Sequence, residues 1–231
     1  MTTDDGAAAP RNSAVPWEGR PDRADVILLA GISLSGIYAL ALLPLVPSLV
    51  GNHAVLLELL RGSMTAMVTM GALARTGHES LVVAVLAALP GLMMFDWLFW
   101  WAGRRWGQRA IALFLGNHPK AAKRTLQLER LTARFGWIAI VIAYFQPVPN
   151  PLIYAAAGLA GMRLVTFLIL DLIGSLLWTG FCVGLGYAIG QRAVDVAHTV
   201  SHYGLYLTIA LIVAIFARQA WIGSRRARSS P

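Results

Sequence analysis

The chain has 231 residues, of which 57% are hydrophobic and 13% are charged, and its formal net charge is +8. Soluble globular domains carry roughly a quarter charged residues, so this composition excludes an ordinary soluble domain. It also excludes intrinsic disorder, which requires low hydrophobicity. A nucleic-acid binder is excluded because the basic residues stand between long apolar segments instead of on one soluble face. The composition predicts a membrane protein with several crossings.

Cysteine and histidine usage excludes most metal sites. Cys182 is the one cysteine, so neither a disulfide framework nor a multi-cysteine metal site is available. His198 and His202 are four residues apart, but no glutamate stands near them, and this spacing alone marks one face of a helix. We expect no metal ion and no cofactor.

The chain begins with a polar segment followed by an apolar one. Residues 1–24 are rich in proline, glycine, alanine and charge, which predicts a disordered cytoplasmic tail. Residues 26–46 form an apolar run of about 20 residues, enough to cross a hydrocarbon core roughly 30 Å thick. This run is too long for a signal peptide and no convincing cleavage site follows it, so we expect a retained span.

A shorter and more broken segment follows, at about residues 49–78. Pro44 and Pro47 interrupt the first helix, and the next apolar run, residues 63–74, is too short to span a bilayer. Short apolar pieces separated by glycine and charge predict a re-entrant hairpin that enters and leaves the membrane on one side. Such a backbone is tolerated at membrane depth only where protein or a water-filled cavity shields it.

Residues 80–103 form the second predicted span, with Pro90 as a kink and Asp96 inside it. The span ends in a cluster of tryptophan and phenylalanine residues before Arg104 and Arg105, which is typical of a membrane–water interface. Residues 104–134 then carry eight lysines and arginines. Their helical spacing over 120–134 predicts a basic amphipathic helix on an anionic leaflet.

The same order of elements then recurs. A short apolar run is followed by Pro147, Pro149 and Pro151, which predicts a second re-entrant hairpin over residues 136–162. Residues 164–190 form the third predicted span and contain Asp171, and residues 203–222 form the fourth. A basic cytoplasmic tail, 223–231, ends the chain.

The distribution of arginine and lysine supports this layout. If both hairpins return to the side they left, the 104–134 loop, Arg163 and both termini fall on the cytoplasmic side. The sequence therefore predicts an all-α integral membrane protein of the cytoplasmic membrane with about four full spans, two opposed re-entrant hairpins and one interfacial helix. Residues 25–222 are expected to form a single membrane domain.

Asp96 and Asp171 are the strongest individual signals of function. A carboxylate at membrane depth costs several kcal/mol, so it normally faces a polar cavity and marks a pathway. The alternative is a structural role near a helix end or in a pair with an arginine such as Arg104. Glu58 and Arg61 likewise either pair with one another at i, i+3 or line the first hairpin.

Polar residues at the break of the second hairpin complete the candidate site. Freed backbone groups and half-helix ends there form a plausible polar binding site. Its candidate residues for a substrate or ion pathway are Glu58, Arg61, Asp96, Arg104, Gln146, Pro147, Asn150 and Asp171.

Two stretches resemble the DedA family of VTT-domain membrane proteins. Gly91–Gly107 is similar to the family's Gly-Asp…Tyr…Gly-Arg-x-x-Gly segment, with Asp96 at the acidic position and Gly103-Arg104 at the Gly-Arg. Residues 135–190, with Ala157-Gly158 and Trp178, resemble its Arg-aromatic-x-Pro…Ala-Gly…Trp region. The resemblance implies movement of lipids between leaflets, undecaprenyl phosphate and phospholipids among them, and a dependence on the proton-motive force.

The chain also departs from the family pattern. Counted back from Ala157-Gly158, the two family arginines fall on Tyr144 and Asn150, and the family's first acidic motif is not recognisable near Glu58. We expect a lipid transporter or scramblase for an anionic lipid, with membrane lipids, protons and a second copy of the chain as candidate partners. The alternative is a non-transporting membrane scaffold. A membrane enzyme has little support, because no metal set or catalytic spacing is present.

Overall fold

The computed structural model describes residues 20–115, 136–146 and 148–190, together with residues 16, 17, 192 and 195. Within these ranges the structure is helical, without β-strands, as the sequence predicts. Three helical stretches there are long and apolar enough to cross a membrane: Arg23–Val50, Leu81–Trp106 and Leu164–Ile189. The predicted fourth span, the amphipathic helix at 120–134 and the tail at 223–231 lie outside the described residues.

The first stretch consists of three consecutive helical pieces. Helix α1 covers Arg23–Leu42, the 3₁₀ helix η1 covers Leu43–Leu45, and α2 covers Val46–Asn52. Asp22 caps α1 through a capping box with Asp25. Pro44 and Pro47 occupy the first turns of η1 and α2, where no backbone donor is required, so they change the helix type without ending the helical stretch.

Helices α3 (Ala54–Arg61) and α4 (Met64–Arg75) form the first hairpin. The chain turns between them at Gly62, whose φ of 57° is accessible at low cost only without a Cβ. Ser63 then caps α4 by accepting a hydrogen bond from the backbone of Ala66. With 12 residues, α4 is about 18 Å long, well short of a bilayer core.

The second long stretch is interrupted twice. It contains α5 (Leu81–Leu86), α6 (Ala88–Met93) and α7 (Asp96–Trp106), and α8 (Gln108–Leu115) follows. Pro90 has no N–H to donate to the carbonyl of Leu86, which accounts for the break at Ala87. A second break at residues 94–95 makes Asp96 the first residue of α7.

The second half of the described chain repeats this order. Residues 136–141 are helical and lead into the 3₁₀ helix η2 (Ala143–Phe145), and after an extended turn α10 covers Asn150–Leu159. These residues, 136–159, are the second hairpin. Helix α11, Leu164–Ile189, is uninterrupted over 26 residues.

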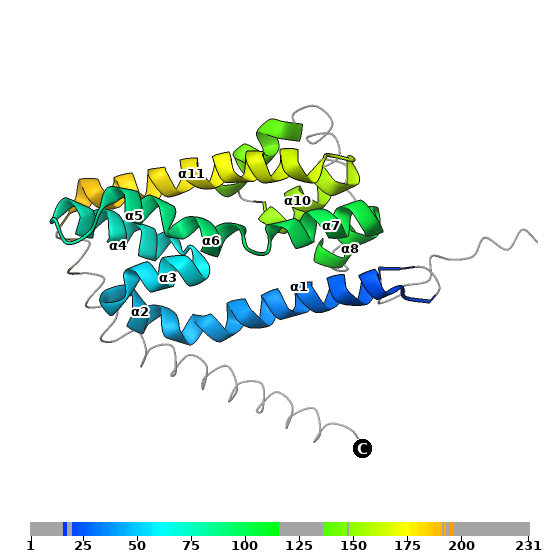
Figure 1. Ribbon diagram of the computed structural model, residues 1–231, viewed down its shortest axis with the longest axis horizontal. Helices are drawn as coiled ribbons and strands as arrows, with labels where there is room; N and C mark the ends of the chain where they lie inside the picture. Colours follow the sequence, from blue (N-terminus) through cyan, green and yellow to red (C-terminus); the bar gives the residue numbers. More distant parts are fainter. Residues whose placement is uncertain are drawn as a thin grey trace, which may run out of the picture.

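The long helices set the shape of the molecule. Helix α11 runs along its length, and α5, α6 and α7 run beside it in the opposite direction (Figure 1). Helices α3 and α4 lie at one end of this pair, whereas α10 lies at the other end (Figure 1). The two main helix–helix interfaces are α4 with α11 and α10 with α7. Each hairpin thus packs against the long helix of the opposite half.

These two interfaces use the same glycine arrangement. A Cβ on Gly71 of α4 would lie 2.0 Å from the carbonyl oxygen of Val183, and one on Gly186 of α11 would lie 1.9 Å from that of Val68. No side chain fits at either position, so the two backbones are in direct contact. Small residues permit this close approach in membrane helices.

The α10–α7 interface has the same glycine contacts as the α4–α11 interface. A Cβ on Gly158 would lie 2.0 Å from the oxygen of Trp100, and one on Gly103 would lie 1.8 Å from that of Ala155. On each of the four helices, the glycine lies three residues after the residue whose carbonyl oxygen contacts the glycine of the partner helix. The two hairpins are therefore packed against their partner helices by the same arrangement of glycines.

The outer faces of the long helices are apolar and exposed. On α1, the side chains of Leu34, Ile37 and Leu40 are each more than 60% exposed, and on α11 Val165 and Leu177 are more than 50% exposed. Such a continuous apolar surface is unfavourable in water and is expected where lipid chains cover it.

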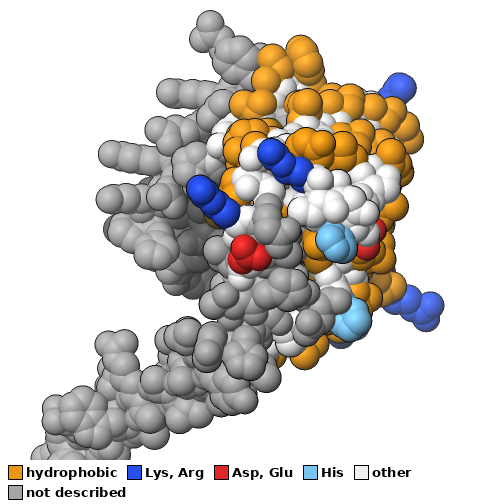
Figure 2. Space-filling model, turned by 90° about the vertical axis from the view of Figure 1, so that its left-hand side faces the viewer, with side chains coloured by type: hydrophobic (Ala, Val, Ile, Leu, Met, Phe, Trp, Pro, Cys, Tyr) orange, Lys and Arg blue, Asp and Glu red, His pale blue; other side chains and the backbone are white. Residues whose placement is uncertain are grey.

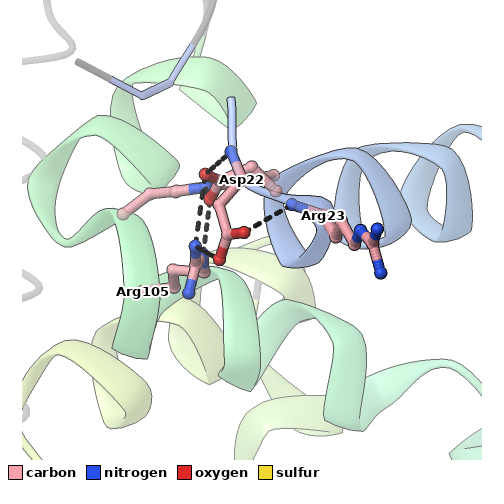
Figure 3. Close-up of polar contacts among 5 residues, drawn as sticks. Asp22, Arg23 and Arg105 are labelled. Atoms are coloured by element: carbon pink, nitrogen blue, oxygen red, sulfur yellow. Dashed lines mark hydrogen bonds and ion pairs between the residues drawn. The ribbon is translucent and has the colours of Figure 1, made fainter. Parts of the chain in front are cut away.

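Charged residues connect the start of α1 to the end of α7. The carboxylate of Asp25, almost fully buried, accepts hydrogen bonds from Arg105 and, at 2.9 Å, from the indole N–H of Trp106. The guanidinium of Arg105 also bonds to Asp22 at 3.0 Å (Figure 3). Trp17, within the predicted disordered tail of residues 1–24, packs against Trp106 with ring centroids 6.4 Å apart. Part of the predicted tail therefore packs against α7.

Asn in place of Asp25 is expected to destabilise the protein. The substitution removes the charge that pairs with Arg105, while the shape of the side chain is kept. We expect Tm in detergent to fall by roughly 5 °C. The neighbouring change Asp22→Asn serves as the control, because the side chain of Asp22 is 66% exposed and asparagine also caps helices. Equal losses of Tm in both variants would contradict this assignment.

Candidate functional site

Five polar side chains meet between the two halves of the molecule. The hydroxyl of Tyr144 donates to Asp96 at 3.2 Å and accepts from Ser175 at 3.2 Å, and the hydroxyl of Tyr154 donates to Asp171 at 2.9 Å. The carboxyl groups of Asp96 and Asp171 lie close enough to interact electrostatically. These five residues are called the polar cluster below.

Several elements contribute to the polar cluster. Asp171 and Ser175 are four residues apart on α11 and so lie on one face of that helix. Asp96 is the first residue of α7, at the break in its stretch, where a helix N-terminus favours a negative side chain. Tyr144 belongs to η2 and Tyr154 to α10, so the second hairpin supplies both hydroxyls.

Burial within the cluster is unequal. Asp171, Tyr154 and Ser175 are fully buried, whereas Asp96 and Tyr144 are partly exposed. Among the described residues, the second carboxyl oxygen of Asp171 has no partner other than the neighbouring carboxyl of Asp96, and the hydroxyl of Thr179, two turns further along the same face of α11, has none. Unsatisfied buried polar groups are costly, so they indicate a functional site more often than a structural one.

Aromatic rings surround the cluster. The ring of Tyr144 stacks on Trp178 with centroids 6.4 Å apart, and Phe145 meets Trp178 edge-on at 5.1 Å. The ring of Tyr154 packs edge-on against Phe167 at 5.2 Å. The cluster is therefore an isolated group of polar atoms within an aromatic and apolar interior.

Glu58 is buried at a different place in the structure. It lies on α3, outside the three candidate spans, and it is fully buried, with no hydrogen-bond partner for either carboxyl oxygen in the part of the chain that the structure describes. Burial, with a smaller contribution from the charge of Glu79, raises the pKa of Glu58 to about 8. Arg61 does not pair with it, because the guanidinium donates to the carbonyl of Ala39 at 3.2 Å.

The raised pKa of Glu58 predicts a pH-dependent stability. Between the usual pKa of 4.5 and about 8, the folded chain keeps a proton that the unfolded chain has released. Stability is therefore lost as pH rises through this window. We expect Glu58→Gln to raise Tm above that of the parent protein at pH 8.5, with the difference shrinking toward pH 4.5. Tm measured across this range tests it.

A matched control for this experiment is Glu79→Gln, since Glu79 is only partly buried. We expect this variant to show a much smaller pH-dependent difference in Tm. A difference for Glu58→Gln that stays constant from pH 4.5 to 8.5 would show that titration of Glu58 does not affect stability.

Among the described residues, no hydrogen bond or ion pair joins the other predicted residues to the polar cluster. Arg104 is exposed near the end of α7, beside Gly161, and Gln146 and Asn150 are partly buried on either side of the turn in the second hairpin. Pro147 lies outside the described residues. Of the eight predicted residues, the structure thus brings together Asp96 and Asp171, and it places Glu58 and Arg61 separately on α3.

Three members of the cluster were not predicted as site residues: Tyr144, Tyr154 and Ser175. The family resemblance marks Tyr144 only as the position of a family arginine. Ser175 could have been found from its i, i+4 spacing to Asp171, because a second polar residue on the same face of an apolar helix indicates an inward-facing polar stripe. Tyr154 carries no comparable signal, since tyrosine is common in apolar helices.

One end of the molecule is polar. Viewed from the end that carries α4 and α5, acidic, basic and histidine side chains gather beside a broad hydrophobic surface (Figure 2). A cavity of about 330 Å³ opens there between α3 and α4, with His53 and Glu79 as its polar lining residues. None of the eight predicted residues lines this cavity. A polar end and apolar flanks fit a molecule that reaches the membrane surface.

The described fold defines a class of protein. Long apolar helices, short hairpins at opposite ends and a polar cluster between them together form a helical integral membrane protein. Residues 61–188, more than half of the chain, match the VTT domain. The chain belongs to this family, the DedA family, as its motifs indicated.

Curated relatives agree with this assignment. The inner membrane protein YabI of Escherichia coli is 28% identical over 83% of this chain and 72% of its own length. Undecaprenyl phosphate transporter A of Staphylococcus aureus is 28% identical over 63% of this chain and 72% of its own. An alkaline phosphatase-like protein of Lactococcus lactis is 26% identical over 65% of this chain and 72% of its own. No solved structure matches the chain.

Proposed function

We propose that this protein moves phosphate-bearing lipids between the two leaflets of a bacterial inner membrane. The observation that carries the proposal is the polar cluster: two carboxyl groups and three hydroxyls that meet where α7, α11 and the second hairpin pack together, with Asp171, Tyr154 and Ser175 fully buried. A lipid head group crossing the bilayer needs polar partners in the interior, because its transfer through hydrocarbon alone is unfavourable. The acyl chains would meanwhile remain in the surrounding lipid.

The relatives support the lipid class. One of them is named for the transport of undecaprenyl phosphate. In this proposal the two hairpins dip into the membrane from opposite faces, both termini are cytoplasmic, and the chain acts as a transporter and not as an enzyme. Glu58, Asp96 and Asp171 hydrate the pathway or carry protons, Gln146 and Asn150 contact the head group, and Arg61 and Arg104 meet phosphate nearer the surface.

A leaflet-exchange assay tests the proposal directly. The purified full-length protein is reconstituted into liposomes that contain a trace of fluorescent phospholipid or polyprenyl phosphate, and an impermeant quencher reports the fraction in the outer leaflet. We expect exchange to be at least ten times faster than in protein-free liposomes. Exchange at the protein-free rate with every lipid would reject the proposal and favour a non-transporting scaffold.

A further inference from the structure

The cavity between α3 and α4 shares no residue with the polar cluster. Its volume, about 330 Å³, lies within the range of roughly 300–1,000 Å³ that is typical of small-molecule sites. Most of its lining is apolar, with Leu56, Met70 and Leu73 among the lining residues, and His53 and Glu79 are polar. All of these residues lie outside the three candidate spans, and His53 is exposed. A ligand can therefore reach the cavity from water.

An acid without a partner is aimed at this cavity. Glu58 is fully buried, and neither of its carboxyl oxygens has a hydrogen-bond partner among the described residues. Ala54 and Val55, which line the cavity, stand one turn before Glu58 on α3, so the three side chains share a face of that helix. Side chains of an α-helix lean toward its N-terminus, which directs the carboxyl of Glu58 toward the wall that Ala54 and Val55 form.

The charge around the cavity favours a cation. Glu79 lines it directly, and the charge of Glu79 contributes to the raised pKa of Glu58. No lysine or arginine is among the described lining residues, and Arg75 of α4 donates instead to the carbonyls of Tyr187 and Ala188. The start of α3 and the end of α4 both border the cavity, and their dipoles favour opposite charges, so the two carboxyl groups decide the sign.

An ammonium group supplies what these two acids lack. It carries three N–H donors, and carboxyl oxygens accept hydrogen bonds. A phosphate or carboxylate ligand would bring further acceptors to Glu58 and Glu79, and an uncharged apolar ligand would leave the buried oxygens of Glu58 unpaired, which is costly. The apolar lining of the cavity, in turn, fits a hydrocarbon body attached to the ammonium.

We infer that this cavity binds a small amphipathic amine, whose ammonium group lies between Glu58 and Glu79 and whose compact hydrocarbon body packs against Leu56, Met70 and Leu73. The ligand is a free amine and not a phospholipid head group, because a phosphate joined to the ammonium would find no lysine or arginine among the described lining residues. Occupancy of this site does not require lipid movement.

Binding of 2-phenylethylamine to the purified protein in detergent tests the inference. Calorimetric titration at pH 8.5, above the raised pKa of Glu58 at about 8, compares this amine with uncharged 2-phenylethanol and with the anion phenylacetate. We expect the amine to bind about ten times more tightly than either, because charge-assisted hydrogen bonds are the stronger ones. Equal affinities for amine and alcohol, tighter binding of phenylacetate, or no binding of the amine would overturn the inference. So would displacement of the amine by phosphatidylethanolamine. None of these outcomes bears on lipid exchange.

Variants locate the ammonium. We expect Glu58→Gln and Glu79→Gln each to weaken binding of the amine about tenfold and to leave binding of the alcohol unchanged, since the shape of the side chain is kept. Leu73→Trp fills the cavity and is expected to abolish binding of both ligands.

The matched control is Asp22→Asn, because Asp22 is an exposed acid before α1, at the opposite end of the molecule from α4 (Figure 1). We expect this variant to bind the amine as the parent does. If it weakens binding as much as Glu79→Gln does, or if Leu73→Trp still binds the amine, the ligand lies elsewhere and the inference is wrong. Thermal unfolding shows which variants are folded, and the comparison of ligands on the unmodified protein decides the matter where a variant is not.

Discussion

Leucine in place of Gly186 is expected to prevent α4 and α11 from packing. A Cβ at this position would lie 1.9 Å from the carbonyl oxygen of Val68, and that oxygen belongs to the backbone and cannot rotate away. The helices would have to separate along their main interface. Overpacking of this kind costs about 3 kcal/mol or more, which lowers Tm by roughly 10 °C in a chain of this size.

The control is Gly184→Leu on the same helix. A Cβ on Gly184 has no atom within 4 Å, so the added side chain projects into open space. Because leucine is a better helix former than glycine, we expect this variant to be at least as stable as the parent. Thermal unfolding of both variants in detergent measures the difference. Similar Tm values for the two would mean that the α4–α11 interface is looser than the structure shows.

The sequence predicted the spans well because their signals are local. The runs that include Val26, Leu81 and Leu164 are long, apolar and almost free of charge, and the structure has helices at each of them. Pro90 also acts as predicted, since the missing N–H breaks the helix at Ala87. The glycines of residues 164–190 indicate close helix packing by their spacing, but which segments meet could not be predicted, because contact between two distant segments, such as Gly71 with Val183, leaves no local pattern.

The site was predictable only in part for the same reason. Asp96 and Asp171 stand out because an acid in an apolar helix is costly wherever it points. Their proximity to one another depends on how α7 packs against α11, which no spacing along the chain reveals. Glu58 has the same cost and the same signal, yet it lies on α3 among other neighbours. Sequence therefore identifies candidate acids, and only packing separates them into sites.

An arginine in place of Tyr144 is expected to speed the movement of polyprenyl phosphate. The hydroxyl of Tyr144 lies 3.2 Å from the carboxyl of Asp96 and 3.2 Å from the hydroxyl of Ser175. A guanidinium placed there would pair with Asp96 and provide further donors that bind phosphate oxygens in a fork geometry. The family resemblance places an arginine at this position. We expect polyprenyl phosphate to exchange between leaflets about tenfold faster than with the unmodified protein.

Phenylalanine at the same position separates charge from shape. Tyr144→Phe removes the hydrogen bonds to Asp96 and Ser175 but keeps the ring that stacks on Trp178, and it adds no positive charge. We expect its exchange rate for polyprenyl phosphate to stay within about twofold of the parent, because no new donor is provided for the phosphate oxygens. A rise of equal size in the arginine and phenylalanine variants would assign the effect to loss of the tyrosine hydroxyl. In that case, the guanidinium would not be what speeds the lipid.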